Sequence, residues 1–292
     1  MNEHIAASGS SCTIEQALRH GRQILTTQTS PYNETLILME HVTGMSKEQL
    51  IAHADEPLNN DLYYRYERCV QRRNEGEPIA YITGLKEFWS LPLYVCPDVL
   101  IPRPETELVV DTALNQLSLS EKAHVLDLGT GSGCIALAIA KERPNTIVMA
   151  SDISNACIQI AKQNAINLNI DNISFTESNW FKNFNVQKFD LIVSNPPYIS
   201  NEDRNLHNDV REYEPEQALI AQQNGFADLE QIIQQAHRFL FQNGKLILEH
   251  GWEQAQQVRN LLDEHGYTNI KTFCDLQGHE RVTMGFYNNN DC

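Results

Sequence analysis

The first 75 residues carry apolar side chains at helical spacing, and polar residues that favour helix starts precede these stretches. Ile14, Ala17 and Leu18 recur at the three- and four-residue intervals that place side chains on one face of a helix. The predicted helices begin at Thr13, where Gln16 completes a capping box, at Asn33 with an end near Gly44, at Ser46 with Gln49, and within 57–75. The pattern therefore predicts a small all-helical domain.

From residue 124 onward, short apolar runs alternate with stretches of helical spacing. The predicted strands are 124–128, 146–151, 173–177, 189–194 and 245–249, and the helices between them include 134–143 and 154–168. Alternation of this kind gives a parallel, doubly wound sheet. Two last strand-like runs, 269–273 and 281–287, have no helix between them and predict a terminal antiparallel hairpin. The predicted fold class is therefore α/β and Rossmann-like, preceded by the helical domain.

Glycine and proline residues separate these two parts. Short strand-like runs within the connector 76–84 and at 87–89 predict a hairpin that bridges two domains. Pro102 and Pro104 then favour an extended lead into a helix that starts near Glu105. The predicted organisation is a helical domain over 1–75, a β-hairpin linker over 76–100 and the main domain over 101–292.

Composition and charge narrow the functional classes. The 292 residues are 41% hydrophobic and carry a formal net charge of −16, which disfavours tight non-specific binding to nucleic acid. The seven cysteines form no C-x-x-C pair, so a reduced, intracellular chain without structural zinc is expected. We see neither a signal peptide nor an apolar run of the ~20 residues that a membrane span needs. These features predict a cytoplasmic protein with no metal site and no membrane partner.

A glycine-rich loop follows the first predicted strand of the sheet. Gly129, Gly131 and Gly133 allow the backbone to turn sharply and to approach a ligand closely. Asp152 ends the next strand, where its carboxylate can accept hydrogen bonds from ribose hydroxyls. The dinucleotide fingerprint G-x-G-x-x-G is not completed, because Cys134 stands where its third glycine is required. The loop instead resembles the S-adenosylmethionine (AdoMet) loop of class I methyltransferases.

Asn195-Pro196-Pro197-Tyr198 follows the predicted strand 189–194. In a sheet ordered 3-2-1-4-5, this strand lies beside the first, so the motif and the glycine loop are expected to face one crevice. In a substrate with a planar, conjugated NH2 group, the nitrogen lone pair is delocalised by resonance. Methyl transfer to that nitrogen is therefore helped by groups that accept hydrogen bonds from its N–H bonds and favour a pyramidal nitrogen. The Asn195 side-chain oxygen and the Pro196 carbonyl can provide them, and Tyr198 can pack on the planar group. The alternative is a rigid turn in which Asn195 caps the strand.

Asn-Pro-Pro-Tyr after this strand is shared by methyltransferases that act on adenine N6 and by those that act on glutamine side-chain amides. Further stretches of the chain narrow the choice between these two acceptors. The chain resembles bacterial release factor glutamine methyltransferases of the PrmC/HemK type in 78–84, 87–88, 101–107, 210–215 and 248–251. That family methylates N5 of the glutamine in the Gly-Gly-Gln tip of class I peptide chain release factors, using AdoMet. The resemblance implies the cofactor-binding residues Gly129, Thr130, Gly131, Ser132, Gly133, Asp152, Trp180 and Asn195. It implies that Asn195, Pro196, Pro197 and Tyr198 bind the glutamine, with Asn195, Pro196 and Tyr198 catalytic.

Several residues keep two interpretations. Trp180 lies against adenine or is a core aromatic residue, and Asn179 replaces an Asp of many relatives, which could alter the adenine contact. The acidic segment 199–218 is a solvated loop or a lid over the peptide. Arg103 is an ion-pair partner or lines the cofactor pocket. His250 is a buried structural histidine rather than a catalyst.

Two rival functions remain at this point. A nucleic-acid adenine-N6 methyltransferase can carry the same Asn-Pro-Pro-Tyr motif, although the net charge of −16 and the lack of a recognisable target-recognition domain count against it. A non-catalytic AdoMet-binding module would bind the cofactor without turnover.

Overall fold

The computed structural model describes residues 12–288 except 27, 29, 186 and 201–211. The chain forms two compact units, Met1–Gly84 and Leu85–Cys292. The hairpin linker predicted over 76–100 is therefore divided, with 76–84 in the first unit and 85–100 in the second.

The first unit is helical. Its elements are α1 (Ile14–Ile24), α2 (Pro31–Thr43), α3 (Lys47–Ala52), α4 (Asn60–Asn74) and α5 (Ile79–Thr83). Leu25, Leu38, Met39 and Leu50 are fully buried in its core. Arg73 on α4 forms an ion pair with Glu34 on α2, with 2.9 Å between Nε and Oε2. The unit is thus held by an apolar centre and by a partly buried charge pair across two of its helices.

The helix signals of this unit were only partly right. The capping boxes of Thr13 with Gln16 and of Ser46 with Gln49 are both confirmed, as is the helix end at Gly44, whose φ is +72°. The predicted start at Asn33 is wrong, because Pro31 occupies the first turn and Ser30 is the N-cap. The strand-like run predicted within 76–84 is also wrong, since Ile79–Thr83 forms the helix α5.

The second unit contains a seven-stranded sheet of order β10-β11-β9-β6-β3-β4-β5. Its strands are β3 (His124–Leu128), β4 (Ile147–Asp152), β5 (Ile173–Glu177), β6 (Phe189–Ser194), β9 (Leu240–Glu249), β10 (Tyr267–Cys274) and β11 (Glu280–Tyr287). The five strands from β3 to β9 in this list run parallel, in the predicted 3-2-1-4-5 order. The last two, β10 and β11, form the predicted antiparallel hairpin. The α/β fold class is confirmed.

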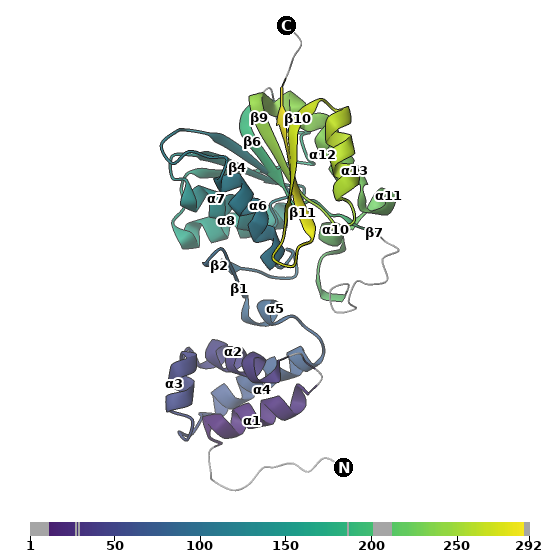
Figure 1. The fold of residues 1–292 in the computed structure, drawn as a ribbon. Helices are drawn as coiled ribbons and strands as arrows, with labels where there is room; N and C mark the ends of the chain where they lie inside the picture. Colours follow the sequence, from purple (N-terminus) through teal and green to yellow (C-terminus); the bar gives the residue numbers. More distant parts are fainter. Residues whose placement is uncertain (1–11, 27, 29, 186, 201–211, 289–292) are drawn as a thin grey trace. The chain divides into compact units, whose positions relative to one another are not determined.

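Helices cover both faces of this sheet (Figure 1). One face packs on α6 (Glu107–Leu114), α7 (Cys134–Glu142) and α8 (Asn155–Leu168), and the other on α12 (Ala227–Ala236) and α13 (Ala255–Glu264). Alternate residues of the central strands serve the two cores: Val125 and Leu191 face one, whereas Leu126 and Ile192 face the other. Burial on both faces explains why these strands read as continuous apolar runs.

A separate hairpin begins the second unit. It joins β1 (Leu85–Phe88) to β2 (Leu91–Tyr94), with positive φ angles at Trp89 and Ser90 in its turn. The buried Asn164 on α8 accepts a hydrogen bond from Tyr94 N at 2.7 Å. Its Nδ2 donates to Tyr94 O at 3.0 Å and to Ser132 O at 2.9 Å. One buried amide therefore ties the hairpin to the glycine loop.

Candidate active site

The sheet brings the two predicted motifs to adjacent strand ends. Leu128, the last residue of β3, pairs in register with Ser194, the last residue of β6. Ser194 Oγ donates a hydrogen bond to Leu128 O at 2.7 Å, which ties the two ends together. Gly129 and Asn195 each follow directly, so the loop and the Asn-Pro-Pro-Tyr motif start side by side at the carboxyl edge. Ligands of doubly wound sheets bind at such a point.

The glycine loop has a backbone that side chains would disturb. Gly129, Gly131 and Gly133 have φ angles of +71°, +55° and +87°, in the left-handed region that favours glycine. A Cβ atom at Gly133 would lie 2.9 Å from Leu137 Cδ1 and 3.1 Å from Ala161 Cβ. The loop is thus packed closely on α7 and α8 at Gly133.

Asp152 holds this loop in place. Its Oδ2 accepts a hydrogen bond from Gly131 N, and its Oδ1 accepts one from Ser154 N, both at 2.9 Å. Burial raises the pKa of this carboxyl, and the two backbone donors oppose the rise. Each carboxylate oxygen can still accept a further hydrogen bond. Asp152 therefore serves the structure and keeps capacity for a ligand hydroxyl.

Asp127 is a second buried acid at the loop, which the sequence analysis did not assign to the site. Its Oδ2 accepts a hydrogen bond from Thr130 Oγ1 at 2.6 Å, while Oδ1 has no partner among the residues that the structure describes. Burial raises the pKa of Asp127 to about 7. An acid between the apolar residues Leu126 and Leu128, two residues before Gly129, was the sequence signal that could have identified it.

Trp180 lies against the start of the loop. A Cβ atom at Gly129 would be 3.4 Å from Trp180 Cζ3, which is an ordinary van der Waals distance, so the ring lies directly beside this residue. Trp180 Nε1 donates a hydrogen bond to Asp228 Oδ1 on α12 at 3.2 Å. The ring also packs on the buried cluster beneath α12 and α13. Trp180 is thus a core-packed residue that also borders the loop.

Asn195 has an amide with a defined orientation. Its Nδ2 donates a hydrogen bond to Oγ1 of the buried Thr106 at 3.1 Å. Thr106 comes from η1 (Pro104–Thr106), directly before α6. Within the described part of the chain, no hydrogen bond is found to Asn195 Oδ1 or to the carbonyl of the buried Pro196. Among the described residues, both oxygens predicted to act as acceptors are thus without a hydrogen-bond donor.

Tyr198 is held at both ends. Its hydroxyl donates a hydrogen bond to Glu249 Oε1 at 3.2 Å, and its carbonyl accepts one from Gln254 Nε2 at 3.2 Å. A Cβ atom at Gly225 would lie only 2.1 Å from that carbonyl oxygen. Because the hydroxyl is engaged, the ring face is the part of Tyr198 that remains for a substrate. Sequence reasoning missed Thr106, Glu249 and Gln254, because these residues are far in sequence from Asn195 and Tyr198, which they contact.

Comparisons with known proteins show which family this chain resembles. A methyltransferase domain model matches residues 119–289, and the PrmC N-terminal domain model matches 16–84. Release factor glutamine methyltransferase of Aliivibrio fischeri is 43% identical over 94% of this chain and 98% of that protein. The proteins of that name from Salmonella typhimurium and Escherichia coli are 47% and 42% identical, over 88% and 92% of this chain and 92% and 97% of those proteins.

The chain belongs to the release factor glutamine methyltransferase family.

Solved structures support the fold of this family member. The hMettl16 catalytic domain superposes with a TM-score of 0.56 at 16% identity, covering 80% of this chain and 82% of that one. A methyltransferase from Pyrococcus furiosus gives 0.52 at 17% identity, over 75% and 98%. Both likenesses concern the fold alone. The family membership makes the chain an enzyme that transfers methyl groups.

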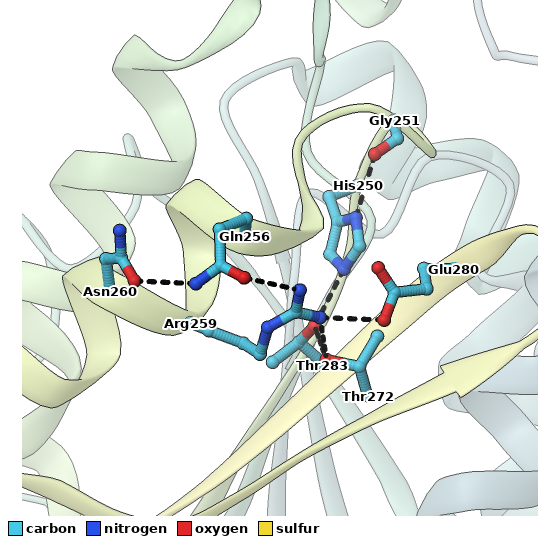
Figure 2. A network of polar contacts seen from close by, with 8 residues as sticks. All are labelled: His250, Gly251, Gln256, Arg259, Asn260, Thr272, Glu280 and Thr283. Atoms are coloured by element: carbon cyan, nitrogen blue, oxygen red, sulfur yellow. Dashed lines mark hydrogen bonds and ion pairs between the residues drawn. The ribbon is translucent and has the colours of Figure 1, made fainter.

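His250 in this methyltransferase is a structural residue (Figure 2). It is fully buried, its Nδ1 lies 2.9 Å from Gly251 O, and its Nε2 lies 2.8 Å from Thr283 Oγ1. From Thr283 the chain of hydrogen bonds continues through Thr272 to Arg259. Burial lowers the pKa of the imidazole, so the ring is neutral, donates from Nδ1 and accepts at Nε2. With both nitrogens engaged, His250 fits the structural interpretation.

Arg103 takes part in an ion pair. Its Nη2 lies 2.5 Å from Oε1 of Glu214, whose side chain is almost fully buried and also accepts from Ile101 N at 3.3 Å. Glu214 lies in the acidic segment 199–218, of which 201–211 are outside the described residues. The ion-pair interpretation of Arg103 therefore has a direct structural basis, and the lid interpretation stays a prediction.

Among the described residues, no cluster of three or more His, Cys, Asp or Glu residues suited to a metal ion was found. No helix in this part of the chain is both long and apolar enough to span a membrane.

Proposed function

We propose that this enzyme transfers the methyl group of AdoMet to the side-chain amide nitrogen, N5, of the glutamine in the Gly-Gly-Gln motif of peptide chain release factors. The observation that carries the proposal is the orientation of Asn195. Its NH2 group is occupied by Thr106, and its oxygen is left as an acceptor beside the glycine loop. The names of the relatives, which cover most of this chain, point to the same substrate. The proposed reaction is cytoplasmic.

The residues at the loop fit AdoMet. Gly129 and Gly131 present backbone without Cβ atoms, and the buried Asp127 has one carboxylate oxygen without a partner in the part of the chain that the structure describes. Asp152 retains acceptor capacity for ribose hydroxyls, and Trp180 borders the loop with an aromatic face. When bound, AdoMet supplies an electrophilic methyl group on a sulfonium. We therefore assign 129–133, Asp152 and Trp180 to cofactor binding, and we add Asp127.

The Asn-Pro-Pro-Tyr motif suits a planar amide. Asn195 Oδ1 and the Pro196 carbonyl can accept one hydrogen bond each from the two N–H groups of the substrate glutamine. Pro197 restricts residue 196 to an extended conformation and so directs that carbonyl. This pairing favours a pyramidal nitrogen with a localised lone pair, which forms the new nitrogen–carbon bond as the sulfur–carbon bond breaks. The methylated nitrogen then releases one proton, and the amide regains its resonance.

The first prediction concerns the substrate. The purified protein, incubated with methyl-labelled AdoMet and an unmethylated release factor, is expected to place the label on the Gly-Gly-Gln glutamine. A release factor whose tip glutamine is replaced by alanine should stay unlabelled, as should DNA and RNA. Peptide mapping of the labelled factor checks the position. Label that persists after the replacement, or label on adenine, would contradict the proposal.

The second prediction concerns the cofactor site. Asp152→Ala removes the acceptor of Gly131 N and the proposed ribose acceptor, so the Kd for AdoMet should rise by roughly 10- to 100-fold, the loss expected for hydrogen bonds to a charged group. Calorimetric titration with AdoMet measures this. Glu177→Ala is the matched control, because Glu177 ends the adjacent strand β5, is exposed, and has Asn155 as its side-chain partner. Equal losses in both variants would remove Asp152 from the site.

A further inference from the structure

Two consecutive prolines leave the centre of the Asn-Pro-Pro-Tyr motif without hydrogen-bond donors. Pro196 and Pro197 have no backbone N–H, so no donor of their own can fix them to a neighbouring segment. The direction of the Pro196 carbonyl, one of the two proposed acceptors, therefore depends on the proline rings and on the residues that flank them. Ser194 holds the near end through its hydrogen bond to Leu128. The precision of the motif then depends on what holds its far end, at Tyr198.

Gln254, the N-cap residue of α13, binds the main chain at that far end. Its Nε2 donates hydrogen bonds to Tyr198 O at 3.2 Å and to Gly225 O at 3.1 Å. One NH2 group thus serves two carbonyls. A Cβ atom at Gly225 would lie 2.1 Å from Tyr198 O and 3.1 Å from Gln254 Nε2, so only glycine permits this close approach. Gln254 therefore joins the end of the motif to a second backbone segment.

Further hydrogen bonds fix which way the Gln254 amide faces. Its Oε1 accepts a hydrogen bond from Gly251 N, and Gln254 N donates to Gly251 O, both at 2.9 Å. Gly251 O also lies 2.9 Å from His250 Nδ1, at the start of the buried network described above (Figure 2). Because the amide oxygen faces an N–H and the nitrogen faces two carbonyls, a flipped amide would lose all three side-chain hydrogen bonds. The Nε2 group is thus directed at Tyr198 from a buried base.

We propose that Gln254 is a positioning residue that fixes the far end of the Asn-Pro-Pro-Tyr motif and, through Tyr198, the direction of the Pro196 carbonyl. This inference rests on the function proposed above. Glu249 holds the hydroxyl of Tyr198 and Gln254 holds its carbonyl, so the side chain and the main chain of this residue are both fixed. Both ends of the Gln254 amide are engaged by the protein, so its role is to place other groups and not to contact the reacting atoms.

The test replaces the Gln254 amide by groups of similar size that cannot donate. Gln254→Glu puts a carboxylate oxygen against two carbonyl oxygens, and Gln254→Met removes the donor without adding charge. Both variants should lower kcat with release factor by roughly 10- to 100-fold, since a displacement of about 1 Å at a reacting centre has a cost of this size. The Kd for AdoMet should change by less than about threefold, because Asp152 and Ser151 anchor the glycine loop separately.

Gln257→Glu and Gln257→Met are the matched controls. They make the same chemical changes at an exposed position of the same helix. Both should leave kcat and the AdoMet Kd as in the wild type. A near-normal kcat in the two Gln254 variants, or equal losses of kcat and of AdoMet affinity, would overturn the inference.

A double variant tests whether Gln254 acts through the main chain of Tyr198. Gly225→Ala displaces the same carbonyl by direct collision. Because changes that share a partner are not additive, Gly225→Ala combined with Gln254→Met should lose at most about threefold more rate than the more damaging single change. Losses that multiply would show that Gln254 acts elsewhere, and would overturn the inference. A residue that contributed only to stability would give such multiplied losses.

A measurement without substrate separates this inference from the proposed function. The chain contains two Tyr-Ile pairs, Tyr81–Ile82 and Tyr198–Ile199, so carbonyl-¹³C tyrosine combined with ¹⁵N isoleucine gives two carbonyl NMR signals. The Tyr198 signal should shift in Gln254→Met and stay in place in Gln257→Met, with the Tyr81 signal as the internal reference. If it shifts in this way but no release factor is labelled, the proposed function fails and the contact of Gln254 with Tyr198 stands. A Tyr198 signal that stays in place in Gln254→Met would overturn the inference.

Discussion

Asn195→Ala is expected to reduce methyl transfer to the release factor by roughly 100- to 1,000-fold or more, the loss seen when one preorganised hydrogen-bonding group of a transition state is removed. The variant loses the side-chain oxygen that would accept an N–H of the substrate amide. It also leaves the buried Thr106 hydroxyl without its donor. The glycine loop is anchored separately, by Asp152 and Ser151, so AdoMet affinity should change by less than about threefold.

Single-turnover rates and calorimetric AdoMet titrations measure these two quantities. Asn167→Ala is a suitable control, because Asn167 is an exposed residue of α8 whose amide oxygen accepts a hydrogen bond from the exposed Gln163. It should leave both quantities unchanged. If Asn195→Ala retained a near-full rate, Asn195 would not be part of the mechanism. A large loss of AdoMet affinity would instead move the residue from substrate to cofactor binding.

Gly225→Ala should cause the second large effect, a roughly 100-fold loss of transfer rate, because a displacement of about 1 Å at a reacting centre has this cost. The added Cβ would lie 2.1 Å from the Tyr198 carbonyl oxygen and 2.8 Å from its carbon. Since both atoms belong to the backbone, the chain at Tyr198 must move. That movement shifts the neighbouring Pro196 carbonyl, one of the two proposed acceptors for the substrate amide.

Gly278→Ala separates this collision from backbone strain. The φ angles of Gly225 and Gly278 are +85° and +86°, but a Cβ at Gly278 meets nothing within 4 Å. Both variants should lose about 1 kcal/mol of folding stability from strain, as measured by denaturant unfolding. Only Gly225→Ala should lose activity. Equal rates for the two variants would show that the approach of residue 225 to Tyr198 has no role in catalysis.

Much of the sheet could be predicted from local sequence. The bounds of β3, β5 and β6 were right to the residue, because short apolar runs bounded by polar or glycine residues coincide with buried parallel strands. The error within 76–84 has a local cause as well. Ile79, Ile82 and Thr83 are β-branched and favour strands, but Gly84, with a φ of +72°, ends a single helical turn that begins after Pro78.

The site could be predicted only where it is local. The glycine loop and the Asn-Pro-Pro-Tyr motif are continuous, and their strand order followed from the alternation of elements. The partners that orient the motif are distant: Thr106 lies 89 residues from Asn195, and Glu249 lies 51 residues from Tyr198. Asp127 lies in the strand just before the glycine loop, yet its burial and its oxygen without a partner among the described residues depend on packing that no single segment encodes.

The bond pattern of Asn164 has a consequence for association between chains. A two-stranded ribbon such as β1–β2 exposes outward N–H and C=O groups, which are a template for pairing with a strand of another molecule. Asn164 takes the N–H and the C=O of Tyr94 together, as the residue of a neighbouring strand would. A single side chain of α8 thus stands in for a third strand at Tyr94. It closes that point of the edge to aggregation.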